Sequence, residues 1–431
     1  MARTSKMGLL PLAASIFFVV SGGPFGIEET VQKAGISTAL LMIAIVPFVW
    51  AIPAALMSAE LGSAIPREGG YYWWVHRAFG PFAGFLCAAW SWMYSWVDVA
   101  IYPVLFATYV GKFAHIGHMT PLMNWLLGLG ILVPMTLLNL RGALQVGLSS
   151  LLFLAVLLVP FIALIFRGFG QGGPVAMSDV SHAAIAPALY AVMWNYLGWD
   201  SLSTVLGEVE GPKRTFPKAL LLTIPIVILL YLLPVWAGWQ VMPDAAKWED
   251  GAWLAILEKA GGPTLYALGG AAAVVYCAGL TMSTMLGASR LPMVLAEDGI
   301  FPKWLGAKHP RFGTPWAAIV VSAVFYFVLS FQSFQSLAEL DVIIYSAALL
   351  LEFGALVALR RDAELERPFR IPGGLFTVLL TALAPVVLVG FALYQTWNEQ
   401  GRETMIWIGL ILLIAPAFWF GRKLFGNLNP A

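Results

Sequence analysis

The stretch SGGPFGIEE at residues 21–29 is the part of the sequence that decides the fold. It lies inside an apolar segment that runs over residues 8–33, yet three glycines and a proline within six residues oppose a continuous helix. A broken helix in a lipid bilayer frees backbone N–H and C=O groups that have no water to bond, so it persists only where those groups line a cavity. The stretch therefore predicts an interrupted membrane helix beside a binding cavity.

The composition of the whole chain supports a membrane location. Of the 431 residues, 60% are hydrophobic and only 11% are charged, whereas a soluble domain carries about 25% charged residues. The 18 tryptophans are also typical of a protein with many rings at the membrane interface. Cys87 and Cys277 both lie in apolar stretches, which argues against a disulfide framework or a zinc site. We expect no metal, no cofactor and no nucleic-acid partner.

Apolar segments of roughly 20 residues, the length that crosses a bilayer, recur along the entire chain. We expect twelve spans, over residues 8–33, 37–61, 81–111, 121–139, 144–166, 183–207, 218–241, 264–289, 314–331, 337–359, 373–395 and 404–421. With these spans, eighteen Lys and Arg residues lie on the side of the termini and six on the other. The excess predicts a multi-pass protein of the cytoplasmic membrane with both termini in the cytoplasm. The longest loops, 242–263 and 290–313, are too short for a catalytic domain, so we expect no enzyme.

A second polar interruption, WNYLGWDS at residues 194–201, lies in the sixth span. Transporters built from inverted repeats place their substrate between two such interruptions near the membrane midplane. Five spans per repeat would invert the second copy. We therefore expect a first repeat over residues 1–170, a second over 171–362, and two further helices with a cytoplasmic C-terminus over 363–431. The alternative is that both interruptions are ordinary kinks, because Gly and Pro are common in membrane helices.

Acidic residues inside the spans are the strongest functional signal. Asp98 lies in the middle of the third span, Asp200 follows the second interruption, and Glu28 and Glu29 follow the first. A charge at the bilayer centre costs at least about 2.5–3.5 kcal/mol, and the spans offer no Lys or Arg as a permanent partner for Asp98 or Asp200. The missing positive charge is then a substrate ammonium or a proton. Alternatively, Asp98 is a protonated carboxyl that is hydrogen-bonded in the bundle, and Asp200 caps the restarted helix.

The remaining acids of the spans have simpler interpretations. Glu60, Glu208 and Glu352 lie near span ends, where we expect each to pair with an Arg or Lys of a loop. Asp341 is expected near the extracellular interface. Of the adjacent Glu28 and Glu29, only one can face a cavity, because neighbouring helical positions point about 100° apart.

Aromatic residues surround both interruptions and can pack against an apolar or cationic solute. Phe25 and Trp194 lie in the interruptions themselves and are the candidate gates, while Asp200 and Asp98 are the candidates for proton coupling. The candidate substrate-binding residues are Gly22, Gly23, Phe25, Gly26, Glu28, Glu29, Tyr94, Asp98, Trp194, Asn195, Tyr196, Trp199 and Tyr276.

Six fragments in order resemble the amino acid-polyamine-organocation (APC) superfamily of transporters with the LeuT-type fold, and most of all its polyamine-uptake, LAT-like branch and bacterial relatives. They are SGGPFGIEETV (21–31), AELGSAIPREGGYYWWV (59–75), VDVAIYPVLF (97–106), NYLGWDSLSTVLGEVEGPKRTFPKAL (195–220), LPMVLAEDGIFPKWLGAKHPRFGTP (291–315), and LLEF (350–353) with RPFRIP (367–372). The resemblance covers nearly the whole chain. It implies an all-α membrane protein with twelve helices, a 5+5 inverted repeat, and broken helices 1 and 6 that hold the substrate.

The resemblance also implies roles for single residues. Trp194 and Asp200 match in spacing the gating Trp and the proton-sensing acid of the related arginine/agmatine antiporter, and Asp98 falls where the polyamine branch has an acid. The sequence departs from the amino-acid branches, whose GSG-type break presents bare N–H groups to a substrate carboxylate. Here Pro24 removes one donor, and Glu28 and Glu29 add negative charge. The fifth span also lacks the Lys of some proton-coupled members.

Together these features predict a secondary transporter, proton-coupled or exchanging, for a small organic amine such as a polyamine or an amino alcohol. A carrier of zwitterionic or cationic amino acids on the same fold is the alternative. A channel and an intramembrane enzyme are the rivals from other classes, although the sequence offers no Ser/His or paired-Asp constellation. Sodium is an alternative coupling ion, with the hydroxyl residues Ser283 and Thr284 as candidate ligands. We expect a monomer or a weak oligomer in the lipid bilayer.

Overall fold

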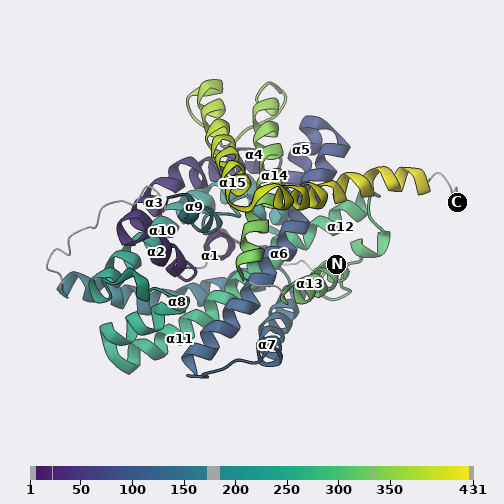
Figure 1. Cartoon of the computed structure of the whole chain (residues 1–431). Coiled ribbons are helices and arrows are strands. Elements are labelled where there is room, and N and C mark those ends of the chain that lie inside the picture. Colours follow the sequence, from purple (N-terminus) through teal and green to yellow (C-terminus); the bar gives the residue numbers. More distant parts are fainter. Residues whose placement is uncertain (1–5, 22, 172–184, 332–333, 427–431) are drawn as a thin grey trace.

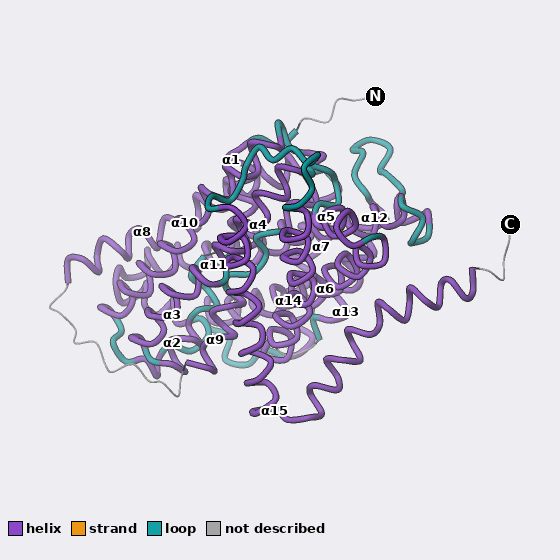
Figure 2. The backbone as a smooth tube through the Cα atoms, turned by 90° about the horizontal axis from the view of Figure 1, so that it is seen from above, coloured by secondary structure: helices purple, strands orange, loops and turns teal. Residues whose placement is uncertain are grey.

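The computed structural model describes residues 6–21, 23–171, 185–331 and 334–426. The regular structure in these residues is helical apart from one isolated bridge between Met7 and Val209 (Figures 1 and 2). The first half of the chain forms α1 (Leu9–Val20), α2 (Glu28–Ala34), α3 (Ile36–Val49), α4 (Ala51–Ala64), α5 (Tyr71–Phe79), α6 (Pro81–Phe113), α7 (Pro121–Leu140), α8 (Ala143–Gln171) and α9 (Ile185–Trp194). The second half forms η2 (Ser201–Glu208), α10 (Pro212–Val241), η3 (Ala245–Lys247), α11 (Ala252–Ala288), α12 (Arg290–Glu297), η4 (Lys303–Gly306), α13 (Trp316–Leu329), α14 (Phe334–Leu359) and α15 (Gly374–Gly426).

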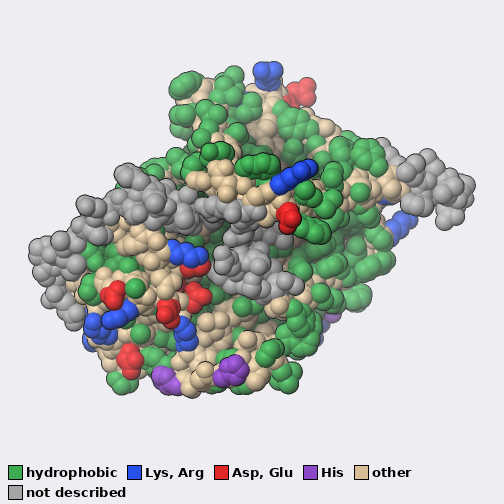
Figure 3. All heavy atoms as spheres, in the orientation of Figure 1, with side chains coloured by type: hydrophobic (Ala, Val, Ile, Leu, Met, Phe, Trp, Pro, Cys, Tyr) green, Lys and Arg blue, Asp and Glu red, His purple; other side chains and the backbone are tan. Residues whose placement is uncertain are grey.

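Many of these helices have the length and the apolar composition of membrane-spanning helices. Nine segments of the described chain are long and apolar enough to cross a membrane, and α1 and α13 are shorter apolar helices. Large apolar side chains such as Phe166 and Phe376 point outward. Hydrophobic side chains cover the upper and right-hand parts of the face seen in Figure 3, and its charged side chains gather mainly over the end that carries α2, α8 and α11. The protein is thus an all-helical, multi-pass membrane protein.

Both predicted interruptions are present. The chain leaves helical geometry between α1 and α2 and again between α9 and η2, which restarts as a 3-10 helix rather than an α-helix. Gly23 and Gly26 adopt φ angles of +119° and +84°, a region that favours glycine because it has no Cβ. The first interruption therefore depends on its glycines, as the sequence predicts.

Three segments expected to be loops contain helices of their own. The helix α5 lies between α4 and α6, α12 follows α11, and the first turns of α11 occupy the connection after α10. Gly261 and Gly262 bend α11 away from these first turns. In α15 a similar bend at Gly401 separates two apolar stretches, Gly374–Asn398 and Gly401–Arg422.

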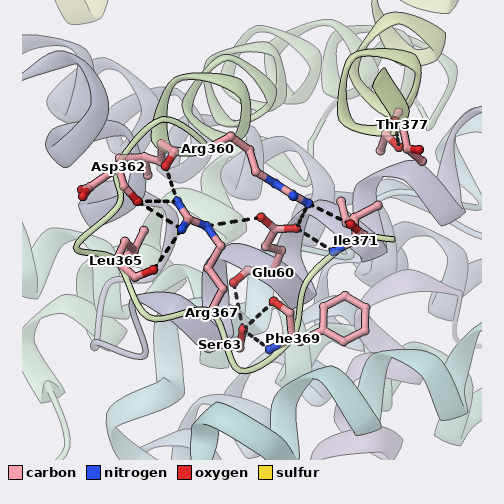
Figure 4. A network of polar contacts seen from close by, with 11 residues as sticks. Glu60, Ser63, Arg360, Asp362, Leu365, Arg367, Phe369, Ile371 and Thr377 are labelled. Atoms are coloured by element: carbon pink, nitrogen blue, oxygen red, sulfur yellow. Dashed lines mark hydrogen bonds and ion pairs between the residues drawn. The ribbon is translucent and has the colours of Figure 1, made fainter. Parts of the chain in front are cut away.

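A buried ion-pair network fastens one end of the bundle (Figure 4). Glu60 on α4 accepts hydrogen bonds from Arg360 Nη2 at 2.5 Å and from the backbone N–H of Ile371 at 2.8 Å. Arg367 Nε lies 3.6 Å from the other carboxylate oxygen of Glu60. The network joins α4 to the residues that connect α14 with α15, and it confirms that Glu60 pairs with arginines at the end of its span.

We predict that Glu60→Gln destabilises the protein by about 3–5 kcal/mol, because it leaves buried guanidinium groups without their anion. Thermal unfolding in detergent measures the effect. The matched control is Glu366→Gln, since Glu366 pairs with Lys213 at the same 2.5 Å but both side chains are exposed. The control should melt close to wild type. Equal melting temperatures for the two variants would contradict a role of this network in stability.

Candidate functional site

A small cavity lies where the two interruptions meet. Its wall is formed by the end of α1, by Tyr94, Asp98 and Tyr102 of α6, and by Trp194 and Asn195 at the end of α9. The cavity has a volume of about 20 Å³, which is room for roughly one water molecule. The structure therefore shows this part of the bundle closed, with a carboxylate in its wall.

Asp98 is the acid of the cavity wall. Its side chain is hydrogen-bonded to Tyr102, one turn farther along α6, and to Trp194. Both partners are neutral donors, and none of the ion pairs found between described residues includes Asp98. Neutral hydrogen bonds hold the carboxylate in place, but they leave its charge without a positive partner in a region of low dielectric.

Trp194 brings the two interruptions into contact. A Cβ placed on Gly26 would lie 3.2 Å from the Trp194 ring and 3.3 Å from the Tyr276 hydroxyl. The Trp194 indole and the Tyr276 hydroxyl thus contact the backbone of the first interruption at Gly26. This close approach needs a glycine at position 26 both for space and for its positive φ angle.

Phe25 lies in an aromatic cluster beside the cavity. Its ring centroid is 5.0 Å from that of Tyr276, 5.1 Å from Tyr109 and 5.3 Å from Phe161. The side chain is fully buried and does not line the small cavity. In this closed arrangement Trp194 and Tyr276 cover Gly26, and Trp194 also forms part of the cavity wall.

The structure separates the roles of the adjacent Glu28 and Glu29. Glu28 is fully buried at the start of α2, where its carboxylate accepts hydrogen bonds from Gly26 N at 2.6 Å, the Tyr109 hydroxyl at 2.9 Å and Gly251 N at 3.3 Å. Glu29 turns outward and pairs with Lys33 at 2.6 Å. Of the two candidates, only Glu28 faces the interior, and its charge also complements the N-terminus of α2.

A buried pair of acids, Asp200 and Glu352, lies beside Tyr345. The Tyr345 hydroxyl donates to Asp200 Oδ1 at 2.5 Å and accepts from Gly198 N at 3.2 Å. The Glu352 carboxyl lies beside that of Asp200, and the Cys87 thiol lies 3.8 Å from Glu352 Oε1. Pairing of Glu352 with a loop cation was the wrong expectation, because α14 packs this residue into the core instead of ending at it.

Asp341 is also misplaced by the sequence prediction. It is fully buried rather than at an interface, and neither carboxylate oxygen has a hydrogen-bond partner among the described residues. Its charge acts on that of Asp98. By contrast, Glu208 pairs as predicted, since Arg290 donates to its Oε1 through Nε at 2.9 Å and Nη2 at 2.7 Å.

Several other candidates belong to the surrounding scaffold. Asn195 lines the cavity, but its backbone and side-chain oxygens both accept from the Tyr231 hydroxyl, at 2.9 and 3.1 Å. Tyr196 donates to the backbone of Ile43, and neither Tyr196 nor Trp199 lines the cavity. Gly23 packs against Leu157. Gly22 lies outside the described residues.

Sequence reasoning missed Tyr102, Tyr345, Asp341 and Glu352 as members of this region. The last three had a signal, because positions 341, 345 and 352 share one face of a helix. Within the described part of the chain, no three His, Cys, Asp or Glu side chains converge as a metal site. Outside the spans, burial raises the pKa of Asp250, whose backbone carbonyl accepts a hydrogen bond from Lys112.

Comparison with known proteins gives a consistent result. Residues 13–416 match the family described as "Amino acid permease". The chain is 36% identical over 419 residues to "Polyamine transporter RMV1" of Arabidopsis thaliana, which covers 95% of this chain and 85% of the relative. It is 34% identical over 427 residues to "Polyamine transporter PUT1" of Oryza sativa subsp. japonica, which covers 98% and 80%. The matched names describe transporters rather than enzymes, in agreement with the sequence prediction.

We predict that Glu28→Gln lowers the stability of the protein by about 1–3 kcal/mol, since an amide has one acceptor oxygen for three donors and turns its own N–H groups toward them. Thermal unfolding in detergent reports the loss. Glu29→Gln, one residue away, removes the same charge from a partly exposed pair and should melt close to wild type. If the two variants melt alike, the hydrogen bonds of Glu28 do not hold the first interruption.

Proposed function

The chain belongs to the amino acid permease family, and on that premise we propose that it is a secondary transporter for a small organic amine, such as a polyamine or an amino alcohol. The observation that carries the proposal is Asp98, a buried carboxylate in the cavity between the two interruptions with no cationic partner among the described residues. A substrate ammonium supplies the missing charge. Tyr94 and Trp194, in the same wall, offer it aromatic faces.

The surroundings of Glu28 favour an amine that carries no carboxylate. The Gly26 N–H lies in the break whose counterpart, in the amino-acid branches of the superfamily that the sequence resembles, receives the carboxylate of the substrate. In this chain the Glu28 carboxylate already accepts that N–H at 2.6 Å, and Pro24 has no N–H to offer. A substrate carboxylate would meet an occupied donor and a nearby negative charge.

A carrier of zwitterionic or cationic amino acids remains the second candidate, because the matched family is described as "Amino acid permease". The names of the relatives favour polyamines instead. The two candidates differ in whether the α-carboxylate of an amino acid is tolerated in the cavity.

Transport proceeds in this proposal by alternating access across the cytoplasmic membrane, with both termini in the cytoplasm. The twelve spans form two inverted repeats of five, over residues 1–170 and 171–362, followed by two helices. Phe25 and Trp194 act as gates. The aromatic contacts of Phe25 and the contact of Trp194 with Gly26 support gating by these residues.

Coupling to protons rests in this proposal on Asp200, which changes its protonation during the cycle, and on Asp98. The neighbouring Glu352 gives Asp200 a second carboxyl with which to hold a proton. Sodium is the alternative coupling ion. Its candidate ligand Ser283 lies 3.4 Å from the Ser150 hydroxyl, a contact that packs α11 against α8.

We predict that Asp98→Asn lowers the kcat/KM of putrescine uptake into proteoliposomes at least about thirty-fold, because a buried ammonium then loses its charge partner. The matched control is Asp362→Asn. Arg77 beside it lowers the pKa of the Asp362 carboxyl, so this residue is anionic, yet it follows the end of α14 and does not line the cavity. Wild-type uptake by Asp98→Asn would remove the central role given to Asp98.

Competition separates the two candidate functions. An excess of neutral amino acids should leave putrescine uptake by the wild-type protein unchanged, because the Gly26 N–H is already bonded to Glu28, whose negative charge repels their carboxylate. Other diamines should compete. Strong inhibition by neutral amino acids would favour the amino acid carrier instead.

A further inference from the structure

Asp341 is a buried acid whose carboxylate has no hydrogen-bond partner among the described residues. It lies in α14, and its side chain is fully buried. A buried polar group without a hydrogen bond is costly, and a buried unpaired charge is more so. A hydrogen-bond donor or a positive charge that reached this side chain would therefore stabilise it.

The packing of α14 against α6 places Asp341 level with Asp98. Along this antiparallel pair, Glu352 lies against Cys87 and the Tyr345 ring lies 5.1 Å from that of Tyr94. One further helical turn brings α14 to Asp341 and α6 to Asp98, since residues four apart share a helix face. The charge of Asp341 also acts on Tyr94 and Tyr102, which line the cavity on either side of Asp98.

The two carboxylates thus lie at one level of the bundle, near enough for the charge of Asp98 to act on Asp341. Like charges at short range oppose each other's ionisation, and no ion pair between described residues neutralises either one. A single ammonium balances one of the two. Complete neutralisation needs two positive charges, or one with a proton.

We propose that Asp98 and Asp341 form the two ends of one site for a dicationic amine, with one ammonium at Asp98 and the other at Asp341. This inference rests on the proposed function and makes it more specific, because it selects α,ω-diamines and longer polyamines over monoamines and amino alcohols. Tyr94 and Tyr102 lie one turn before and one turn after Asp98 on α6 and line the same cavity, where their rings pack against the methylene chain of the diamine. With a cavity of about 20 Å³ in the closed state, the diamine enters only when the broken segments separate.

Binding of putrescine and butylamine to the purified protein tests the proposal, because the two amines share a four-carbon chain and differ in one ammonium. Thermal-shift titrations in detergent give a Kd for each. In the wild-type protein, putrescine should bind at least about tenfold more tightly than butylamine, which corresponds to about 1.4 kcal/mol. In Asp341→Asn this ratio should fall to near one while the Kd of butylamine stays within about twofold of wild type.

Glu366→Gln is the matched control, because it removes an exposed negative charge near the other end of α14 and should keep the wild-type ratio. The isosteric Asp341→Asn removes a repulsive charge from the core, and its retained affinity for butylamine shows that the cavity is folded. An unchanged putrescine-to-butylamine ratio in Asp341→Asn would overturn the second subsite while leaving the amine transporter intact. A change confined to the pH dependence of binding, with the ratio preserved, would likewise overturn it and make Asp341 a proton site.

A different set of results would contradict the proposed function as an amine transporter. In that case neither amine stabilises the wild-type protein, and Asp98→Asn behaves like wild type in both uptake and binding. These results are separable from loss of the ratio in Asp341→Asn alone.

Discussion

The structure depends on carboxylates that are buried at the centre of the bundle and form no ion pair with any described residue. Asp98 faces the cavity between two interrupted helices, and Asp341 lies at the same level on the packed face of α14. Burial makes each charge expensive, so the protein is most stable when a mobile positive group reaches them. A transporter needs such an arrangement, because a permanent salt bridge would remove the need for the substrate.

The ends of the bundle show that the chain pairs its acids elsewhere. Glu60 has Arg360 and Arg367, and Glu208 has the fully buried Arg290. These pairs hold elements that are distant in sequence, such as α4 and the residues after α14. Glu28 represents a third solution, in which three neutral donors surround a buried carboxylate. The contrast with Asp98 and Asp341 supports the proposed binding role of the two unpaired acids.

The sequence predicted those features that follow from local chemistry. Glycine and proline composition located the first interruption, and the 100° step of a helix correctly limited Glu28 and Glu29 to one inward side chain. Pairing of Glu60 and Glu208 followed from their positions near span ends, beside loops that contain Lys and Arg. The helices α5 and α12 were missed because they are short amphipathic segments in connections that lack a membrane-length apolar run.

Asp341 and Glu352 were misplaced because their burial is a tertiary effect. Both lie toward the ends of an apolar segment, where hydropathy alone suggests an interface, and only the packing of α14 on α6 encloses them. Conversely, Tyr196 and Trp199 lie in the second interruption yet do not line the cavity.

A cryo-electron microscopy structure of the protein saturated with putrescine tests most directly whether the unpaired acid Asp98 binds the ammonium group of the substrate. We expect an ammonium nitrogen about 2.7–2.9 Å from an Asp98 carboxylate oxygen. Ligand density away from both interruptions, or a Lys or Arg side chain already bound to Asp98, would contradict it.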